Sequence, residues 1–492
     1  MSPHPENYRF SAEKGQQTDP FEIDSPLVVD LDGTLVQTDL LVESFLALIK
    51  RNPLYLFAAL FWFLRGKAYL KRQISRRVNL DVTVLPYHQE LLDYLREQRV
   101  HRRRILLATG TDEQIARQVA DHLGLFDEVL GSDGTTNLSG RRKRDRLVKE
   151  FGEKKFDYAG NGRGDIPLWS SARKAILVDV SGNLMGAVTR TVEVERVFWA
   201  RKKGVKPYVE ALRLHQWLKN LLVFVPLVMA HRFVEPDLIA KNLIAFVAFG
   251  LCASSVYLSN DLIDLSADRH HPRKMKRPFA AGDLSPLFGL LASPWLLGFS
   301  LLLGLLLSSD FLWMLVTYYL LNLAYSFYFK QVALLDVILL AGLYTMRIMA
   351  GSASVDIWPS SWLLAFSTFI FLSLALVKRY AELVIIHAET GKVPVRGYQI
   401  IDKELLASLG SGSGYVAVLV LAIYISSGKA EILYTRHHFI WLLCPLLLYW
   451  ISYVWLIAHR GAMLDDPLVF ALKDRVSQIT LLLAGVVFLL AM

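Results

Sequence analysis

The chain has 492 residues, of which 53% are hydrophobic, and its formal net charge at pH 7 is +9. The length exceeds one ordinary domain, and the apolar residues concentrate after about residue 217, so we expect a soluble part followed by a membrane part. The two cysteines both lie inside apolar runs, which argues against disulfides and a zinc site. The basic residues lie beside the apolar runs, which indicates membrane topology and phosphate binding and not nucleic-acid binding.

The chain begins with a polar tail over residues 1–24 that lacks an apolar signal core, so we expect the next part to stay in the cytoplasm. Residues 27–31, LVVDL, form a β-branched-rich run between a proline and a glycine, and this pattern predicts a short buried strand. The strand delivers Asp30 and Asp32 into the loop DLDGTL. Two carboxylates therefore lie together at a strand end.

This loop resembles the first motif, DxDGT, of the haloacid-dehalogenase-like (HAD) phosphohydrolases. The resemblance implies an α/β Rossmann-like domain with a helical cap, over residues 25–190. It also implies that Asp30 attacks phosphorus as the nucleophile and that Asp32 is the general acid/base. Thr109, in RILLATGTD, would bind the phosphoryl oxygens, and Lys143, in GRRKRDRL, would neutralise charge.

The last HAD motif is carried by FDYAGNGRGDIPLW, with one departure from the pattern G-D-x-x-x-D. Asn161 stands where the first Asp is usual, and Asp165 keeps the second. The resemblance implies a Mg²⁺ site formed by Asp30, Asp32, Asn161 and Asp165. An asparagine brings a carbonyl oxygen but no charge, so the metal affinity should fall. A working phosphatase and a weakened or regulatory domain both stay open.

Residues 40–100, between the first two motifs, predict the helical cap. Its segment NPLYLFAALFWFLRGKAYLKR holds an apolar run of roughly a dozen residues, too short to span a bilayer. Basic residues flank the run, and Tyr55, Trp62 and Tyr69 suit an interface. A helix on the membrane surface that steers a lipid-linked phosphate towards Asp30 and a buried cap helix are both open interpretations.

A basic linker with an amphipathic helix is predicted over residues 191–216, before a membrane domain over residues 217–492. The basic residues of the linker suit an anionic inner-leaflet surface: Arg201, Lys202, Lys203 and Lys206. Nine apolar spans are predicted, centred near residues 224, 249, 298, 319, 342, 372, 420, 447 and 483. With the first domain in the cytoplasm, the loops after even-numbered spans hold most basic residues, which supports this orientation in a bacterial inner membrane.

The segment NDLIDLSADRHHPRKMKRP, residues 260–278, places carboxylates and cations at the mouth of an apolar span. Asn260, Asp264 and Asp268 recur every four residues, so on a helix they share one face. With Asp261 they offer the oxygen ligands that suit Mg²⁺ on a diphosphate. The alternative is a solvated loop that only follows the distribution of charge across a membrane.

Residues 260–282 resemble the first aspartate motif, N-D-x-x-D-x-x-x-D, of the UbiA superfamily of intramembrane transferases. LRLHQWLKN before the first span, YSFYFKQVALLDVILLAGLYTMRIMAG (325–351) and VKRYAEL (377–383) extend the likeness to one branch, the bacterial decaprenyl-phosphate phosphoribosyltransferases. The resemblance implies an all-α bundle that moves a phosphoribosyl group from phosphoribosyl diphosphate to a polyprenyl phosphate. A second aspartate cluster, usual in members that prenylate aromatic rings, is thin here.

The resemblance also implies roles for polar residues of the membrane domain. Mg²⁺ on the donor diphosphate would be bound by Asn260, Asp261, Asp264 and Asp268, of which Asp264 and Asp268 are taken as catalytic. The donor phosphates would be bound by Lys274, Lys276 and Arg277, and the acceptor phosphate by Lys330, Arg347, Lys378 and Arg379, beside Tyr325 and Asp336. Arg347 lies within an apolar span, so its guanidinium needs an anionic partner; a substrate phosphate and an ion pair with Asp336 are both open.

The two parts together predict consecutive steps on one lipid, with the HAD domain dephosphorylating the product of the membrane domain. The alternative is prenyl transfer from a polyprenyl diphosphate to an aromatic or other acceptor, beside a weakened or regulatory HAD domain. A non-catalytic scaffold is the third interpretation. We expect Mg²⁺ at both sites and the lipid bilayer as a partner, and a homo-oligomer is compatible with the sequence.

Overall fold

The computed structural model describes residues 25–199, 204–390, 397–463 and 466–492. The predicted tail over residues 1–24, and Arg201, Lys202 and Lys203 of the linker, lie outside the described residues. The chain divides into two compact units. The first extends to Pro207 and includes residues 262–288, and the second comprises residues 208–261 and 289–492. The aspartate-rich segment is therefore shared between the units, a division that the predicted domain boundaries do not make.

The first unit contains a six-stranded parallel sheet with the strand order β3-β2-β1-β4-β5-β6. The strands are β1 (Leu27–Val29), β2 (Ile105–Asp112), β3 (Glu128–Ser132), β4 (Asp157–Gly160), β5 (Lys174–Val178) and β6 (Glu193–Phe198). The central strand β1 is fully buried, and Val29 lies beside Leu107 on one side and Ala159 on the other. Asp30 and Asp32 follow it at the carboxyl edge, where open α/β sheets bind their ligands. The Rossmann-like fold is confirmed.

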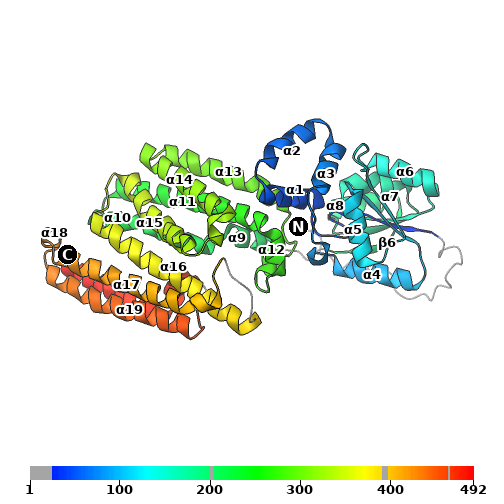
Figure 1. Cartoon of the computed structure of the whole chain (residues 1–492). Helices are drawn as coiled ribbons and strands as arrows, with labels where there is room; N and C mark the ends of the chain where they lie inside the picture. Colours follow the sequence, from blue (N-terminus) through cyan, green and yellow to red (C-terminus); the bar gives the residue numbers. More distant parts are fainter. Residues whose placement is uncertain (1–24, 200–203, 391–396, 464–465) are drawn as a thin grey trace, which may run out of the picture. The chain divides into compact units, whose positions relative to one another are not determined.

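Helices cover both faces of this sheet (Figure 1). One hydrophobic core joins the sheet to α4 (Gln89–Val100) and α5 (Glu113–Leu123) through residues such as Leu91 and Ile115. The other joins it to α6 (Arg141–Phe151), α7 (Ile166–Ser171) and α8 (Gly182–Val188) through residues such as Leu147 and Trp169. Because α4 packs on the sheet, the cap is shorter than residues 40–100 and consists of α1 (Leu40–Arg51), α2 (Tyr55–Leu64) and α3 (Lys67–Ser75).

Residues 262–288 complete the first unit with α12 (Leu265–His270) and a 3₁₀ turn over Lys274–Lys276. A buried ion pair joins this segment to α1 of the cap. The Arg269 guanidinium donates to both carboxylate oxygens of Glu43, at 2.8 and 2.5 Å. Both side chains are about one-twentieth exposed, 5% and 4%. Sequence patterns give no signal for this pair, because its residues are 226 positions apart.

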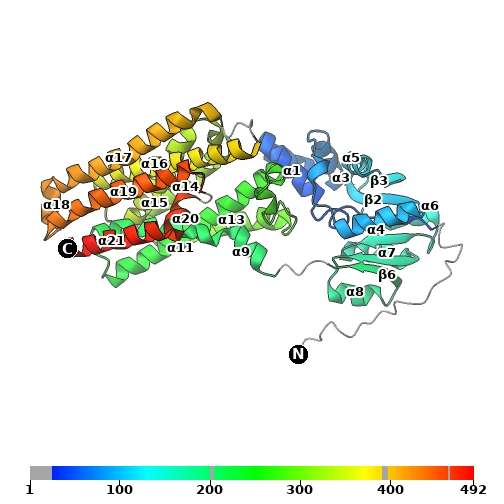
Figure 2. The ribbon, with the colours of Figure 1, turned by 90° about the horizontal axis from the view of Figure 1, so that it is seen from below.

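The second unit is a bundle of helices that run side by side (Figures 1 and 2). Among neighbouring helices, α16 lies between α15 and α17. The helices are α9 (Lys206–Leu212), α10 (Val225–Met229), α11 (Pro236–Ile263), α13 (Pro286–Leu305), α14 (Ser309–Phe327), α15 (Leu335–Val355), α16 (Ser361–Thr390), α17 (Lys403–Ile425), α18 (Gly428–Leu433), α19 (Leu443–His459), α20 (Pro467–Lys473) and α21 (Arg475–Ala491), with 3₁₀ segments η4 (Leu214–Phe224), η6 (Phe329–Gln331) and η8 (His437–Leu442).

Six helical segments of the described residues are long and apolar enough to cross a membrane, and a seventh is counted if α20 and α21, bent by 80°, form one span. The sequence predicted nine spans, and this number is not confirmed. Near residue 224 the chain forms the 3₁₀ segment η4 and then the short α10, so no long helix is present there. Near residue 319, α14 carries three tyrosines and an asparagine, which lower its apolar character.

Candidate functional sites

Lys143 and Asp30 meet at the carboxyl edge of the sheet. Asp30 follows β1, and Lys143 comes from the first turn of α6. The Lys143 ammonium donates to Asp30 Oδ1 at 2.6 Å, to the Ala108 carbonyl at 3.0 Å and to the Tyr158 hydroxyl at 3.0 Å. Lys143 and Asp30 are buried, so the three partners hold the ammonium in one position against the carboxylate.

The electrostatics of Asp30 are set by burial and by neighbouring carboxylates. Burial raises the pKa of Asp30, and Lys143 lowers it by less. The charges of Asp165 and Asp32 raise it further, so that the pKa of Asp30 is about 7. A further cation near these carboxylates would favour the ionised form of Asp30, which is the form that can act as a nucleophile.

Asp32 is held by the start of the cap and by β2. Its carboxylate accepts from the Leu40 backbone N–H at 2.9 Å and from the Thr111 hydroxyl at 2.6 Å. The Thr109 hydroxyl lies 3.4 Å from the same carboxylate. Burial, and then the Asp39 carboxylate, raise the pKa of Asp32, which favours the protonated form that a general acid needs. Thr111 was not predicted, although it lies two residues after Thr109 and therefore on the same face of the strand.

The last HAD motif lies beside these residues. Asp165 accepts from the Tyr158 hydroxyl at 2.8 Å and from the backbone N–H groups of Asn161 and Gly162 at 3.1 Å each. The Asn161 side chain lies against Gly33, because a Cβ atom built on Gly33 would be 2.1 Å from Asn161 Nδ2. We name Asp30, Asp32, Lys143, Asn161 and Asp165 the catalytic cluster. Tyr158 joins Lys143 to Asp165, a role that no motif predicted.

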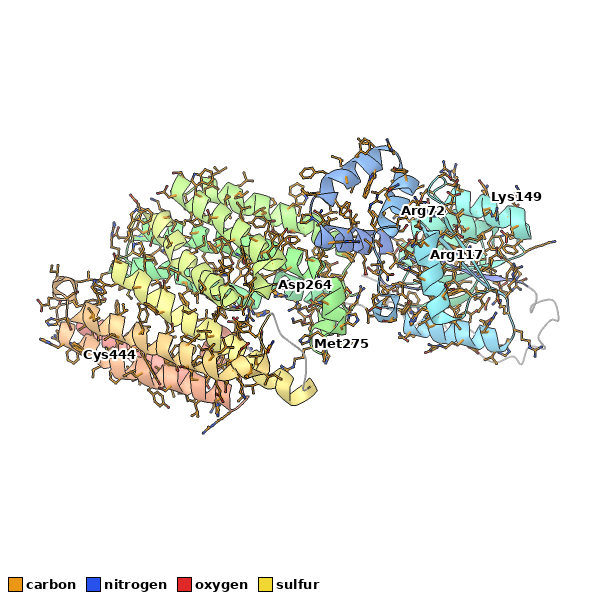
Figure 3. All side chains as sticks on the ribbon, in the orientation of Figure 1. Arg72, Arg117, Lys149, Asp264, Met275 and Cys444 are labelled. Atoms are coloured by element: carbon orange, nitrogen blue, oxygen red, sulfur yellow. The ribbon has the colours of Figure 1, made fainter. Side chains whose placement is uncertain are left out.

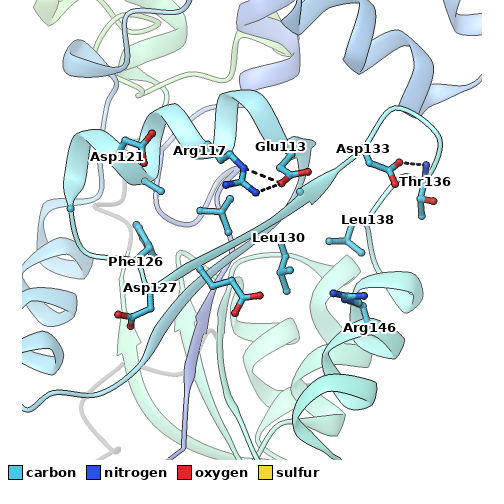
Figure 4. Close-up of a pocket in the computed structure, with 15 residues that line it drawn as sticks. Glu113, Arg117, Asp121, Phe126, Asp127, Leu130, Asp133, Thr136, Leu138 and Arg146 are labelled. Atoms are coloured by element: carbon cyan, nitrogen blue, oxygen red, sulfur yellow. Dashed lines mark hydrogen bonds and ion pairs between the residues drawn. The ribbon is translucent and has the colours of Figure 1, made fainter.

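The first unit also contains a wide hollow (Figure 4). Its volume is about 900 Å³, and residues of α5 and β3 line it. In its wall, Arg117 of α5 donates to Glu113 of the same helix at 2.5 Å. None of the catalytic cluster lines this hollow. The predicted site residues of the first unit therefore lie at the carboxyl edge of the sheet and do not line the hollow.

The aspartate-rich segment is interrupted by one residue. Asn260 and Asp261 lie in the last turn of α11, and Asp264 stands at the break before α12 (Figure 3). Residues 260–268 are therefore not one uninterrupted helix as predicted. Asp264 is the residue that precedes α12, and its side chain makes no capping hydrogen bond to that helix.

The predicted metal ligands of this segment have different surroundings. In the second unit, Asp261 is paired with Arg213, and the Asn260 side-chain oxygen is buried without a hydrogen-bond partner. In the first unit, Asp264 is 3.3 Å from Lys50, and Asp268 accepts from Arg277 at 2.6 Å. Lys274 and Lys276 belong to the 3₁₀ turn that follows α12. Among the described residues, no group of three or more His, Cys, Asp or Glu side chains is arranged to hold a metal ion.

Two lysines converge on one carboxylate in the second unit. Asp466, which precedes α20, lies 2.9 Å from the Lys219 ammonium of η4 and 3.0 Å from the Lys378 ammonium of α16. The Tyr344 hydroxyl lies 3.5 Å from the same carboxylate. Burial raises the pKa of Asp466, but Lys378 and Lys219 lower it by more, so that it stays well below its usual range.

Arg347 of α15 lies beside these residues and is itself buried. Its guanidinium donates to the Asn220 side-chain oxygen at 3.1 Å, to the Leu343 carbonyl at 2.8 Å and to the Tyr318 hydroxyl at 2.7 Å. It also lies over the ring of Tyr344, 5.3 Å from the centroid. These partners are neutral, and none of the ion pairs found in the described residues includes Arg347. The name Asp466 cluster is used for Lys219, Tyr344, Arg347, Lys378 and Asp466.

Arg379 belongs to a separate network in which two carboxylates pair with one guanidinium. Its guanidinium is paired with Asp336, donates to Glu382 at 2.7 Å and to the Tyr325 hydroxyl at 2.9 Å. Tyr398 donates to the same Asp336 carboxylate. The alternative that Arg347 pairs with Asp336 is therefore wrong, because Arg379 occupies Asp336. Lys330 lies in η6, after the helix that carries Tyr325.

Sequence reasoning found Arg347 and Lys378 but missed Lys219 and Asp466. Lys219 lies within LRLHQWLKN, a segment that the UbiA resemblance already included. Asp466 directly precedes a proline, which looks like an ordinary helix start. Their meeting depends on contacts across about 250 residues, so only the fold could reveal it.

Comparison with known proteins agrees with both parts of the chain. The family model described as the UbiA prenyltransferase family matches residues 221–473. The model described as haloacid dehalogenase-like hydrolase matches residues 27–170. Both matches overlap the regions in which the motifs were recognised.

One of the curated relatives matches nearly the whole length of this chain. The uncharacterized protein y4nM of Sinorhizobium fredii is 35% identical over 96% of this chain and 92% of its own length. Nodulation protein NoeC of Azorhizobium caulinodans is 34% identical over 59% of this chain and 96% of its own length. Decaprenyl-phosphate phosphoribosyltransferase of Mycolicibacterium smegmatis is 31% identical over 61% of this chain and 96% of its own length.

These matches and the apolar helices of the bundle indicate a multi-pass membrane protein. The chain belongs to the UbiA prenyltransferase family and carries a haloacid dehalogenase-like hydrolase domain in its first unit.

Proposed function

We propose that the second unit transfers a phosphoribosyl group from phosphoribosyl diphosphate to a polyprenyl phosphate, and that the HAD domain dephosphorylates the lipid-linked product. The name of the Mycolicibacterium smegmatis relative is one support. The observation that carries the proposal is the excess of positive charge in the Asp466 cluster, where Arg347 is buried and the Lys219 and Lys378 side chains are partly buried. Both proposed reactions act on phosphate groups. The chain accordingly has two candidate phosphate sites, the Asp466 cluster and the catalytic cluster.

The Asp466 cluster holds three cations and one carboxylate. Unbalanced charge inside a membrane protein is costly unless a partner of opposite sign is present. The phosphate group of a polyprenyl phosphate would supply up to two negative charges and so balance the cluster. An uncharged aromatic acceptor would leave the excess in place. The cluster therefore favours a phosphorylated acceptor over the alternative of aromatic prenylation.

The aspartate-rich segment would bind the donor. Mg²⁺, when bound, offsets negative charge on the leaving diphosphate. The Asn260 side-chain oxygen is buried without a hydrogen-bond partner, and oxygen atoms are the ligands that Mg²⁺ prefers, so this residue fits the ion. We assign Asn260, Asp261, Asp264 and Asp268 to the metal, and Lys274, Lys276 and Arg277 to the donor phosphates.

The proposed transfer is a single displacement at the anomeric carbon of the ribose. An oxygen of the acceptor phosphate forms a bond to this carbon, and the bond to the diphosphate oxygen breaks. The diphosphate leaves with the bonding electron pair. Lys219, Lys378 and Arg347 would hold the acceptor phosphate so that one oxygen can approach that carbon. Arg379 is held in place by the carboxylates of Asp336 and Glu382. With Tyr325 and Lys330, it would line the part of the same unit that receives the acceptor.

The catalytic cluster supports phosphate-ester hydrolysis in two steps. Asp30 would attack phosphorus and form an aspartyl-phosphate, while Asp32 gives a proton to the leaving alcohol. Asp32 would then take a proton from the water that releases phosphate. Lys143 holds Asp30, and Thr109 and Thr111 would orient phosphoryl oxygens.

The donor set of the catalytic cluster also fits Mg²⁺. It comprises two carboxylates that repel each other, Asp30 and Asp165, and the amide oxygen of Asn161. When bound, the ion supplies positive charge at the phosphoryl group. With Asn161 in place of an aspartate, the site offers one negative charge fewer, so its affinity for the metal is expected to be weaker than with three carboxylates.

We place the protein in a bacterial inner membrane with the HAD domain in the cytoplasm. The support is the group of basic residues at 269–277, which follows the first long apolar helix. Phosphoribosyl diphosphate is a soluble, charged compound, so the site that receives it would have to face the compartment that contains it.

The test is transfer of label from phosphoribosyl diphosphate into a lipid. Detergent-solubilised full-length protein is incubated with Mg²⁺, labelled phosphoribosyl diphosphate and a polyprenyl phosphate, and the lipid phase is counted. We expect labelled lipid with wild type, none with Asp264→Ala, and wild-type levels with the control Asp310→Ala, which changes an exposed aspartate at the start of α14. The phosphate content of the product reports the HAD step.

Absence of labelled lipid from a folded wild-type protein would contradict phosphoribosyl transfer. Incorporation of a prenyl group from a polyprenyl diphosphate into an aromatic acceptor, in the same preparation, would then support the alternative. A product that keeps its 5-phosphate while Asp30 is intact would contradict the second step only.

A further inference from the structure

The cap of the HAD domain carries an apolar surface that no part of the first unit covers. Helix α2 buries Ala59 and Trp62 in a small core with Leu48 and Ile74. Its outer face is formed by large apolar side chains that are at least half exposed: Leu54 (69%), Leu56 (53%), Phe57 (73%), Leu60 (64%), Phe61 (55%), Phe63 (50%) and Leu64 (78%). Of the two interpretations left open by the sequence, a fully buried cap helix does not agree with these exposures. Exposed apolar patches of this kind mark interaction sites.

The charge around this surface has one sign. Between Glu43 and Asp81 the sequence contains no Asp or Glu and eight basic residues: Lys50, Arg51, Arg65, Lys67, Lys71, Arg72, Arg76 and Arg77. Lys50 and Arg51 precede α2, and Arg65 and Lys67 follow it; all four are exposed. The Arg65 guanidinium lies 4.7 Å from the centroid of the Phe61 ring, so a cation borders the apolar face directly.

We propose that α2 is an interfacial anchor, whose outer face enters the boundary between head groups and acyl chains of an anionic bilayer. The apolar face matches the acyl region, and the basic residues at both ends match anionic head groups. A helix of ten residues is about 15 Å long, half the thickness of the hydrocarbon core of a bilayer. Helix α2 is therefore too short to span the bilayer and would lie along its surface. A protein partner would have to be both apolar and acidic at its edges, whereas a bilayer is available to every multi-pass membrane protein.

The anchor is joined to the catalytic cluster through α3. Gly66 connects α2 to α3 with a φ of 114°, a backbone conformation that glycine adopts readily. From α3, Lys71 donates to the Gly110 carbonyl and, at 2.8 Å, to the Asn137 side chain, while Arg72 is 3.3 Å from Asp112. These contacts tie the anchor to the last residues of β2, where Thr111 donates to Asp32, and to the loop that follows β3.

This inference rests on the proposed phosphatase and names its class of substrate. A phosphate monoester carried by a lipid stays at the bilayer surface, so a cap inserted in that surface would raise its concentration near Asp30. Lys71 and Arg72 add positive charge along the approach. A water-soluble phosphate monoester gains nothing from the anchor. The HAD domain is therefore expected to distinguish lipid-linked from soluble substrates by their location.

The first test measures insertion and does not depend on enzyme activity. Full-length protein with Cys252→Ala and Cys444→Ala is reconstituted into phosphatidylglycerol vesicles after an environment-sensitive dye is placed at Phe61→Cys. The matched control carries the dye at Val100→Cys, which is 80% exposed at the end of α4. We expect quenching by spin-labelled acyl chains to be about threefold stronger at position 61 than at position 100. Equal, weak quenching at both positions would overturn the anchor.

The second test asks whether the anchor serves the phosphatase. Phe57→Ser with Phe61→Ser is expected to lower kcat/KM for a polyprenyl-linked phosphate monoester by about tenfold, because two large apolar side chains no longer enter the bilayer. Hydrolysis of p-nitrophenyl phosphate should be unchanged, which also reports that the domain is folded. Equal loss on both substrates would contradict the proposed selectivity. Wild-type protein inactive on both would contradict the phosphatase, while the quenching result would still decide the anchor.

Discussion

The catalytic cluster of the first unit and the Asp466 cluster of the second unit contain opposite excesses of charge. The first gathers three carboxylates around one lysine, and the pKa of Asp30 is raised to about 7 as a result of burial and of its acidic neighbours. The second gathers three cations around one carboxylate, and the pKa of Asp466 is held well below its usual range. The first cluster therefore lacks positive charge, and the second lacks negative charge.

The difference indicates which ligand each cluster needs first. A carboxylate-rich site is expected to bind a metal cation before it can hold a phosphoryl group, because phosphate alone would add repulsion. A cation-rich site can receive a phosphate directly. The comparison therefore explains why the first unit would depend on Mg²⁺ at the phosphate itself, whereas the acceptor phosphate of the second unit would be held by side chains.

The largest expected effect comes from removing the proposed nucleophile of the catalytic cluster, which should stop the reaction of the first unit and leave that of the second. Asp30→Asn should reduce release of phosphate from the lipid-linked product by at least about a thousandfold, because the aspartyl-phosphate can no longer form. Transfer by the second unit should continue, so the phosphorylated lipid should accumulate. Asp93→Asn, an exposed aspartate of α4, is the control. The measurement is the phosphate content of the labelled lipid, and continued dephosphorylation by Asp30→Asn would contradict the assignment.

The second prediction concerns Arg379, the cation that already pairs with two carboxylates. Arg379→Gln leaves Asp336 buried without its guanidinium, and loss of one partner of a buried pair costs about 3–5 kcal/mol in the free energy of unfolding. Asp336 is 0% exposed, so solvent cannot replace the lost partner. Stability is measured by detergent unfolding of the full chain.

The control for Arg379 is Arg232→Gln, which breaks a solvent-exposed pair with Glu235 in the same unit. It should change stability little. A normal stability for Arg379→Gln, together with loss of acceptor binding, would show instead that Arg379 contacts the acceptor phosphate, as the sequence alone predicted.

The third prediction concerns a cation of the unbalanced cluster. Lys219→Met should lower kcat/KM for the polyprenyl phosphate by roughly 10- to 100-fold, the effect of removing one charged hydrogen bond of about 1.5–3 kcal/mol. The KM for phosphoribosyl diphosphate should not change, because we propose that this substrate binds at the aspartate-rich segment. Steady-state kinetics with each substrate varied in turn separate the two effects. An equal rise in both KM values would contradict a distinct acceptor site.

The sequence predicted the parts of these clusters that belong to local motifs. Asp30, Asp32 and Asp165 follow strands or short turns whose patterns are recognisable, and the structure brings them together at one edge of the sheet. Lys143 was selected from several neighbouring basic residues, and it contacts Asp30. Residues whose role comes from distant packing were missed, such as Tyr158.

Counting spans from hydropathy was less successful, for a physical reason. Hydropathy measures how apolar a segment is and not whether it forms one long helix. The run near residue 224 is apolar, yet Pro226 lies at the start of the short α10, after a 3₁₀ segment. The partners of Arg347 were also beyond prediction, since nothing in a single sequence shows that Arg379 occupies Asp336.

The smallest expected effect tests the charge of the catalytic cluster directly. Asn161→Asp restores a carboxylate at the position where the HAD pattern has one, so the site gains a negative charge toward the metal. The Mg²⁺ concentration that gives half of the maximal phosphatase rate should fall by about tenfold. The control is Asn137→Asp, which adds the same charge outside the catalytic cluster, next to Lys71.

The outcome for Asn161→Asp also decides between the two interpretations of the HAD domain. If the wild type is a working phosphatase with weak metal binding, the variant should reach the same maximal rate at a lower Mg²⁺ concentration. If the domain is weakened because it lacks this charge, the maximal rate itself should rise. An unchanged Mg²⁺ dependence would mean that Asn161 is not a metal ligand, and its contact with Gly33 would then be packing alone.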